Sequence, residues 1–176
     1  MKPSEPIPVK LFCGVLFSDE QLSNHSRLSL FEKYGEIDFQ SNKFNFEISE
    51  YYHPEMGWPI YRTFWSFDKL INPNEIARIK IECNEIEDQL AVKGDRKVNL
   101  DPGYMDYDKI VLASAKYNGQ KIYLNDGIYA DLTLRYEKGT YYPYPWSFPD
   151  FKAGLYNQTF LRIREIYKVQ LKKGEL

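Results

Sequence analysis

Residues 9–17 constrain the fold of this 176-residue chain more than any other segment. Apolar side chains occur at nearly every position, with Leu11 on one face of an extended segment and Phe12 and Leu16 on the other. Because side chains alternate between the two faces of a strand, this pattern is typical of a central strand that is covered on both sides. We therefore expect a mixed α and β protein whose sheet is built around this strand.

The segment that follows predicts a helix from Ser18 to Tyr34. Ser18 and Gln21 have the spacing of a capping box, and Gly35 is typical of the residue that ends a helix. The apolar residues that we expect to face the core are Leu22, Leu28, Phe31 and Tyr34.

Two strands are predicted next, at 43–51 and 60–67. In the first, Phe44 and Phe46 alternate with polar residues, which is the pattern of a half-buried strand. The second is rich in aromatic and β-branched residues, which favour strands. Residues 52–59 contain two prolines and a glycine and are expected to form a loop.

Residues 73–91 carry the clearest helix pattern in the chain. Asn72 is predicted as the N-cap, Pro73 as the first helical residue, and Gly94 as the point where the chain leaves the helix. The apolar stripe, with steps of three and four residues, consists of Ile76, Ile79, Cys83, Ile86 and Leu90. With a further strand at 97–100, the predicted order is that of the ferredoxin-like βαββαβ unit.

An antiparallel β-meander is predicted to follow. Asn118-Gly119 and Asp126-Gly127 are typical of type I′ turns, in which both central residues have positive φ. Strict alternation at 128–136 predicts a strand between such turns.

A final helix is predicted at about 153–170. The residues it is expected to bury are Phe160, Ile163 and Tyr167. No repeat, low-complexity stretch or linker divides the chain, so residues 1–176 are predicted to form a single domain, with 1–8 as an extended tail. The predicted fold class is α+β: a ferredoxin-like βαββαβ start, an antiparallel β-meander and a C-terminal helix.

Composition narrows the classes of function. The net charge is −2, whereas generic nucleic-acid binding usually needs a basic surface, so nucleic acid is not the expected partner. No run approaches the roughly 20 apolar residues that cross a bilayer, and the N-terminus lacks the apolar segment of a signal peptide. These features predict a cytoplasmic protein without a membrane partner. Cys13 and Cys83 are isolated in apolar patterns, as reduced core thiols are.

The common motifs of cofactor binding and nucleophilic catalysis are absent from the sequence. It contains no phosphate-binding loop, no dinucleotide fingerprint and no G-x-S-x-G nucleophile elbow. Only two histidines occur, His25 and His53, which excludes a histidine-rich metal site. No metal site is therefore predicted, and no cofactor is identified.

Two polar groupings lie in predicted loops, and each also has a purely structural interpretation. His53 and Glu55 can ligate a metal or shuttle protons, or they can form a solvated loop pair. Asp101 precedes Pro102-Gly103, which predicts a type II turn. Such a turn either holds a carboxylate rigidly at a strand end or only reverses the chain.

A third polar grouping lies on one face of the strand predicted at 128–136. It includes Tyr129, Asp131 and Arg135. The structural interpretation is a solvated sheet face. If these groups instead converge in a cleft with charges of both signs, they have the usual character of a small-molecule site.

Several segments in order resemble a family of prokaryotic proteins known as domain of unknown function 4416. The residues that carry the resemblance are Pro8–Gly14, Tyr51-Tyr52, Glu55–Gly57, Val98–Tyr104, Val111–Ser114, Ile122–Leu124, Gly127–Asp131 and Pro145–Asp150. The resemblance covers nearly the whole chain and implies no particular activity. Members are sometimes labelled GTP-binding, but this sequence has neither a phosphate-binding loop nor the Asn-Lys-x-Asp guanine motif.

The favoured hypothesis is a site for a small anionic or phosphate-containing ligand, with or without catalysis. Its carboxylates, the catalytic candidates, are Glu55, Asp101 and Asp131. Its ligand-binding candidates are Arg62, Arg96, Lys116, Tyr104 and Tyr129. Two alternatives stay open: a nucleotide or RNA-binding module that uses an aromatic sheet face, and a protein-interaction subunit without catalytic activity.

Overall fold

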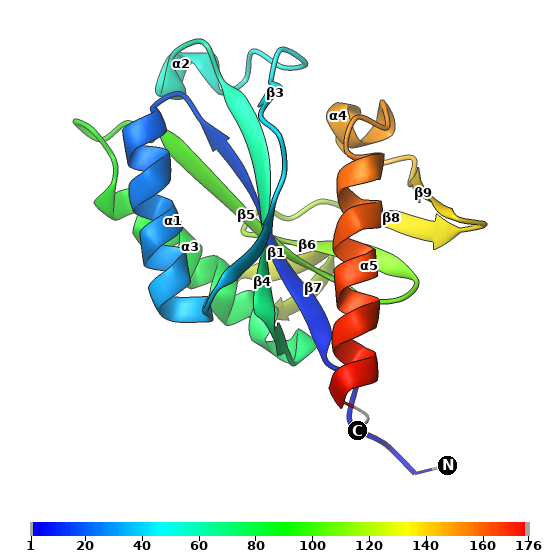
Figure 1. Cartoon of the computed structure of the whole chain (residues 1–176). Helices are drawn as coiled ribbons and strands as arrows, with labels where there is room; N and C mark the ends of the chain where they lie inside the picture. Colours follow the sequence, from blue (N-terminus) through cyan, green and yellow to red (C-terminus); the bar gives the residue numbers. More distant parts are fainter. Residues whose placement is uncertain (1, 175–176) are drawn as a thin grey trace.

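The computed structural model describes residues 2–174, which form a nine-stranded antiparallel sheet with helices on both faces (Figure 1). The strands are β1 (Val9–Phe17), β2 (Ile37–Gln40), β3 (Phe44–Asn45), β4 (Tyr61–Ile71), β5 (Val98–Met105), β6 (Lys109–Ser114), β7 (Ile122–Asn125), β8 (Ile128–Glu137) and β9 (Thr140–Pro143). Their order in the sheet is β2-β4-β1-β5-β6-β8-β7, with β3 paired to β4 and β9 paired to β8. The prediction of a mixed α+β fold is confirmed.

Five α-helices are present within residues 2–174. They are α1 (Glu20–Tyr34), α2 (His53–Met56), α3 (Ile76–Gln89), α4 (Pro149–Lys152) and α5 (Asn157–Gly174), and a 3-10 turn at Pro73–Glu75 precedes α3. None of these helices combines the length and the apolar character that crossing a bilayer requires.

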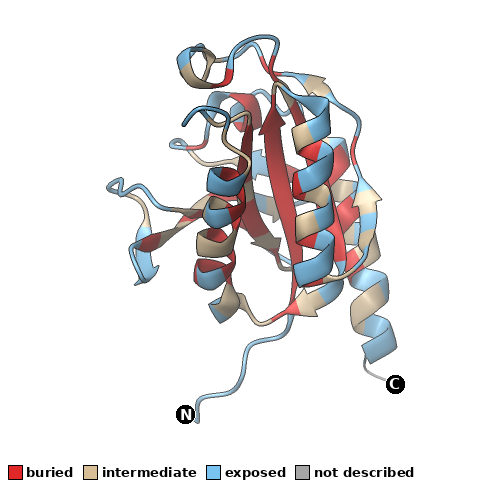
Figure 2. Ribbon diagram, turned by 90° about the vertical axis from the view of Figure 1, so that its left-hand side faces the viewer, coloured by how far each residue is buried: buried red, intermediate tan, exposed pale blue. Residues whose placement is uncertain are grey.

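The prediction that β1 is central and covered on both faces is confirmed. All nine residues of β1 are buried, and the strand lies between β4 and β5 (Figure 2). On one face, α1 and α3 pack on side chains such as Leu11 and Val15. The predicted stripe of α3 faces this core: Ile76, Ile79, Cys83 and Ile86 are buried, and Leu90 is half-buried.

The other face of the sheet is covered by α5. Phe160 of this helix packs edge-on against Phe12 and Phe64, with ring centroids 5.3 and 5.1 Å apart. The three residues predicted to be buried, Phe160, Ile163 and Tyr167, are all buried. The last helix begins at Asn157, later than predicted, because residues 153–156 form a turn in which Gly154 has a positive φ of 72°.

The inward face of α1 differs in part from the prediction, since Tyr34 is buried and Leu22 packs against the core as predicted, but the other two residues do not. Leu28 and Phe31 are 57% and 47% exposed. The buried residues are Ser23, Ser26, Leu30 and Tyr34. The stripe that faces the sheet therefore carries small hydroxyl side chains, and Ser26 Oγ satisfies its donor by bonding to Ser23 O at 2.8 Å. The N-cap is Asp19, whose side chain accepts a hydrogen bond from Leu22 N, in place of the predicted Ser18.

The strand predicted at 43–51 is wrong for most of its length. Only Phe44-Asn45 pairs with β4, and the strand that follows α1 is β2. Residues 46–52 have no regular structure, and Phe46 packs beneath them in a small core cluster with Met56 of α2 and Ile60. Phe46, one of the alternating apolar residues, is buried under a loop and not in a sheet. The sequence pattern does not distinguish this kind of burial from a half-buried strand.

The turn predicted at Pro102-Gly103 is also wrong, because these residues lie inside β5. The whole of β5 pairs with β1, but it pairs with β6 only from Gly103 to Met105. Proline has no N–H to donate, and Pro102 lies where the pairing with β6 stops. Beyond this point β5 and β6 diverge, and the sheet opens into a fork.

Of the predicted turns, one has the expected backbone. Asp126 and Gly127 have φ values of 50° and 76° and join β7 to β8. At Asn118-Gly119 the chain also reverses, through a bond of 2.9 Å from Lys121 N to Asn118 O. Neither residue has positive φ, and β6 pairs with β8 and not with β7, so the type I′ prediction is wrong there.

Candidate functional site

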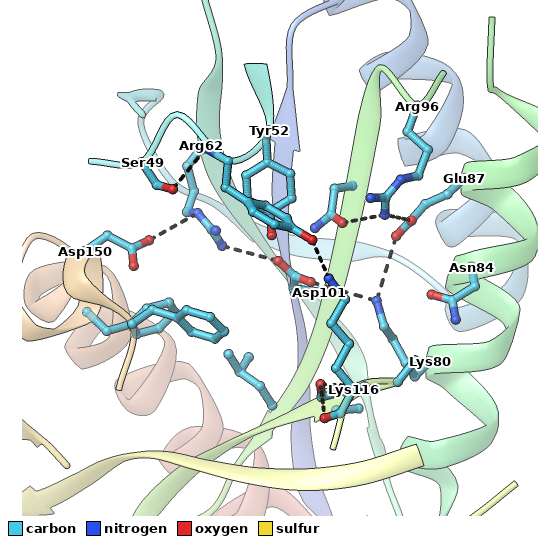
Figure 3. Close-up of a pocket in the computed structure, with 18 of the residues that line it drawn as sticks. Ser49, Tyr52, Arg62, Lys80, Asn84, Glu87, Arg96, Asp101, Lys116 and Asp150 are labelled. Atoms are coloured by element: carbon cyan, nitrogen blue, oxygen red, sulfur yellow. Dashed lines mark hydrogen bonds and ion pairs between the residues drawn. The ribbon is translucent and has the colours of Figure 1, made fainter. Parts of the chain in front are cut away.

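A cavity of about 820 Å³ lies in the fork between β5 and β6 (Figure 3). Its walls come from the 46–52 segment, β4, α3, the diverging ends of β5 and β6, the 115–121 loop and α4. Phe46, Tyr51, Phe148 and other aromatic residues form much of the lining. This volume is typical of sites for small molecules.

Charged side chains of alternating sign run along the cavity. In order, each within 4 Å of the next, they are Glu55, Arg96, Glu87, Lys80, Asp101, Arg62 and Asp150. We call this row the charged seam. All of its members except Glu55 line the cavity. The two arginines of the seam differ sharply in their partners.

Arg96 is held by hydrogen bonds from three directions. Its Nε and Nη2 donate to the two carboxylate oxygens of Glu55 at 2.7 and 2.9 Å. Its Nη1 donates to Glu87 at 2.9 Å and to Asn99 Oδ1 at 3.0 Å. The hydrogen bond from Arg96 holds the pKa of Glu55 below its usual range, so both groups stay charged. Arg96 thus ties α2 and α3 to the start of β5.

Lys80 and Glu87 replace the strand that is missing on the open side of β5. Lys80 Nζ donates to Leu100 O, and Leu100 N donates to Glu87 Oε1, both at 2.6 Å. Since β6 does not reach Leu100, these two α3 side chains satisfy its backbone. Burial raises the pKa of Glu87. Burial lowers the pKa of Lys80, but the carboxylates of Asp101 and Glu87 outweigh it and the net pKa is raised.

Arg62 lies at the other end of the seam with no such partners. It is 6% exposed, and within residues 2–174 its guanidinium makes no hydrogen bond. Its Nη1 is 3.7 Å from Asp101 Oδ2 and its Nε is 3.5 Å from Asp150 Oδ2. Nε is buried without a hydrogen-bond acceptor. Four aromatic rings surround the guanidinium, with centroids 5.3 to 6.0 Å away: Phe46, Phe64, Phe151 and Tyr156.

Gly14 makes room for this guanidinium on the sheet. It pairs with Phe64 on one side and Asp101 on the other. A Cβ at Gly14 would lie 3.1 Å from Arg62 Nη1 and 3.1 Å from the Phe64 ring, which is tighter than ordinary contact. The glycine therefore fixes where Arg62 can lie.

Two further polar groups of the cavity, Asn99 Nδ2 and the Asp101 carboxylate, make no hydrogen bond within residues 2–174. Asn99 Nδ2 is buried without a hydrogen bond, although its Oδ1 accepts from Arg96. The Asp101 carboxylate is at ion-pair distance from Arg62 and Lys80, at 3.7 and 3.8 Å, but no hydrogen bond reaches it. Unpaired polar groups of this kind are costly when buried.

Lys116 lies at the mouth of the cavity. Its Nζ donates to the Tyr51 hydroxyl at 2.8 Å and so joins the 115–121 loop to the 46–52 segment. This hydrogen bond lowers the pKa of Tyr51. The mouth is therefore cationic and aromatic.

The structure brings together half of the residues predicted for the site. Arg62, Arg96, Asp101 and Lys116 line the cavity. Glu55 lies behind Arg96, and Asp131 is buried 3.5 Å from the lining residue Lys121. Tyr129 contacts the ring of Tyr117 at the rim, with centroids 5.7 Å apart. Tyr104 packs against the core below α1 and α3, since alternation along β5 turns it away from Asn99 and Asp101.

Sequence reasoning missed Lys80, Glu87 and Asp150. Lys80 and Glu87 are charged residues seven positions apart, on the buried side of α3. Charges that interrupt an apolar stripe at helical spacing are the signal that identifies such residues. Asp150 is 2% exposed and accepts a bond of 2.9 Å from the Tyr156 hydroxyl, which the sequence does not reveal. Residues 2–174 contain no cluster of three or more His, Cys, Asp or Glu that could hold a metal ion.

A family model described as "Domain of unknown function (DUF4416)" matches residues 7–167. The resemblance noted in the sequence is confirmed over this range. No curated protein and no solved structure matches the chain. The description of the family names no ligand or reaction.

Proposed function

Because the chain belongs to the family of domain of unknown function 4416, which is defined without an activity, we propose from the geometry that it binds a small anionic ligand in the fork between β5 and β6. The observation that carries this proposal is Arg62, a buried guanidinium without a hydrogen bond that lines the cavity.

A buried guanidinium without hydrogen bonds is expensive unless something else satisfies it. It has five N–H donors in a planar fork, and carboxylate or phosphate oxygens match that fork. Asp101 and Asp150 balance the charge of Arg62 at 3.7 and 3.5 Å but do not hydrogen-bond to it. Oxygens of a ligand would supply the bonds that the protein leaves unmade.

Two other donors support an anion at this place. Asn99 Nδ2 is buried and unpaired on the cavity wall. Lys116 adds a positive charge at the mouth, where it can attract an anion on its way in. The aromatic part of the lining lowers the local polarity, which strengthens each of these interactions.

The fold around the cavity supports a second, structural proposal. We propose that β1, α1, β2, β4, α3 and β5 form the predicted ferredoxin-like unit. The spatial order β2-β4-β1-β5, antiparallel throughout, supports it. In this unit β5 is the last strand, and its open side forms one arm of the fork. The meander that follows supplies the other arm.

Isothermal titration calorimetry with inorganic phosphate and glycerol 3-phosphate tests the anion-binding proposal. We expect binding by the native chain and a loss of at least about tenfold in affinity for Arg62→Gln, since one charge-assisted bond is worth about 1.5–3 kcal/mol. Arg162→Gln is the matched control, because Arg162 is an exposed arginine of α5. Equal affinity in Arg62→Gln and the native chain would rule the proposal out.

A further inference from the structure

The Asp101 carboxylate restricts which anions the cavity can accept. It lines the cavity, is 27% exposed, and lies 3.7 Å from the Arg62 guanidinium. An anionic group bound to Arg62 is therefore placed beside a second negative charge. Like charges at this distance repel, and in a partly buried site the repulsion is only weakly screened.

A hydrogen-bond donor on the ligand removes this conflict. Within residues 2–174 no hydrogen bond reaches Asp101, so the lone pairs that it turns to the cavity are free. A donor placed next to the anionic group of the ligand can bond to Asp101 while the anion bonds to Arg62. The pair of Arg62 and Asp101 is then complementary to a ligand that carries an anionic group and a hydrogen-bond donor next to each other.

The surrounding charges favour a neutral donor over a cationic one. Asp101 already lies between two cations, since Lys80 Nζ is 3.8 Å away on the side opposite Arg62. An ammonium group at Asp101 would be brought close to both, whereas a hydroxyl donates without adding charge. The unpaired Asn99 Nδ2 can donate to the oxygen of such a hydroxyl.

The rest of the lining suits a hydroxylated body. Asn84, Ser49 and Ser114 add neutral polar groups, and aromatic faces such as Phe148 can pack on C–H groups. Resting on the proposed function, we infer that the ligand is a hydroxylated anion, that is, a phosphorylated or carboxylated polyol, with its anionic group on Arg62 and a neighbouring hydroxyl on Asp101.

Three small phosphate esters test this inference by calorimetry. They are propyl phosphate, without a donor, glycerol 3-phosphate, with hydroxyls, and phosphoethanolamine, with an ammonium group. We expect glycerol 3-phosphate to bind about tenfold more tightly than either of the others, the value of one hydrogen bond to a charged group.

Asp101→Asn sharpens the comparison because it removes the charge but keeps the shape. In this variant propyl phosphate should bind more tightly than in the native chain, and the advantage of glycerol 3-phosphate should fall to less than about threefold. Asp108→Asn is the matched control: it removes the charge of an exposed carboxylate outside the cavity and should leave the ranking unchanged.

The outcomes distinguish a failure of the anion-binding proposal from a failure of the inference about the hydroxyl group. If no ester binds, the proposed function itself fails. If all three bind equally in the native chain, the anion site stands and the hydroxyl inference is overturned. Tightest binding of phosphoethanolamine would overturn it in favour of a zwitterion. The affinities of the three esters for the native chain can be ranked without a variant, so the inference is tested even if Asp101→Asn does not fold.

Discussion

The two arginines of the charged seam line the same cavity but have opposite surroundings. The Arg96 guanidinium donates four hydrogen bonds, to Glu55, Glu87 and Asn99, and joins three elements. Arg62 is more deeply buried and makes none within residues 2–174. The comparison teaches that burial and charge alone do not identify a ligand-binding arginine. Unmade hydrogen bonds beside a cavity are what set Arg62 apart, because a folded chain otherwise satisfies most of its buried donors.

The difference follows from the elements that surround each arginine. Arg96 precedes β5, where α2 and α3 both offer carboxylates. Arg62 lies inside β4 among aromatic rings, and Gly14 holds its guanidinium over the sheet. On the proposed function, the Arg96 end of the seam serves stability and the Arg62 end serves binding, and this division can be tested.

The largest expected effect is on the stability of Arg96→Ala. The variant leaves Glu87, which is 3% exposed, without its hydrogen-bonded cation. Removing one partner of a buried pair typically costs about 3–5 kcal/mol, and we expect about 3 because Lys80 stays near Glu87. Urea unfolding measures it. Arg78→Ala is the control: Arg78 is an exposed arginine of α3 with two ion pairs, and its loss should cost under about 1 kcal/mol. Equal losses of unfolding free energy in the two variants would contradict the structural role of Arg96.

Arg62→Met is expected to have a smaller effect on stability. Its ion pairs are longer than hydrogen bonds, and Asp150 keeps the Tyr156 hydroxyl, so we expect a loss of about 1 kcal/mol in urea unfolding. Adding Asp150→Asn should move stability back toward that of the native chain, because the remaining buried charge is removed. A loss as large as that of Arg96→Ala would mean that Arg62 is a structural residue.

Gly14→Ala tests whether the position of Arg62 matters. The added methyl group crowds Arg62 Nη1 and the Phe64 ring. We expect the affinity for glycerol 3-phosphate to fall about fivefold, which corresponds to about 1 kcal/mol. Gly119→Ala makes the same change in the loop at the mouth, where no atom lies within 4 Å of the new Cβ. It should leave affinity unchanged, and an equal loss in both variants would argue against a role of Gly14.

The smallest expected effect is a pH dependence at the Arg96 end. Burial raises the pKa of Glu87 above its ordinary 4.5, so the folded state binds its proton more tightly than the unfolded state does. The contribution of Glu87 to stability is therefore full below pH 4.5 and is lost as pH rises through the folded pKa. Glu55, with a lowered pKa, acts in the opposite sense and loses its contribution as pH falls.

Glu87→Gln should accordingly gain stability relative to the native chain as pH rises from 4 toward 7, by less than about 1 kcal/mol. Urea titrations of both proteins across this range measure the difference. A constant difference at all pH values would contradict the assigned direction of the Glu87 pKa.

Sequence periodicity predicted the elements that are covered by a regular layer. β1 and α3 bury regular stripes of apolar residues, so their periods of two and of three to four residues are visible. α1 buries Ser23 and Ser26, and the segment after β3 buries Phe46 under a loop, so apolar pattern gave the wrong face or the wrong element. Apolar periodicity alone therefore does not show which face of an element is buried or what covers it.

The sequence was enough to predict several charged residues of the site, but not how these residues are placed relative to one another. Arg62, Arg96 and Asp101 were singled out as charged residues near strands, and all three line the cavity. Their different roles depend on the register that pairs Asp101 with Gly14 and on the fork at Pro102. Both are set by long-range pairing, which no local pattern specifies.

The most direct test of the division between Arg62 and Arg96 is an NMR titration of the arginine Nε–H signals with glycerol 3-phosphate. The Arg62 signal should shift, because the guanidinium to which this Nε belongs gains hydrogen bonds from the ligand. The Arg96 signal, already bonded to Glu55, should stay in place. An unchanged Arg62 signal, or a shift confined to Arg96, would contradict the account.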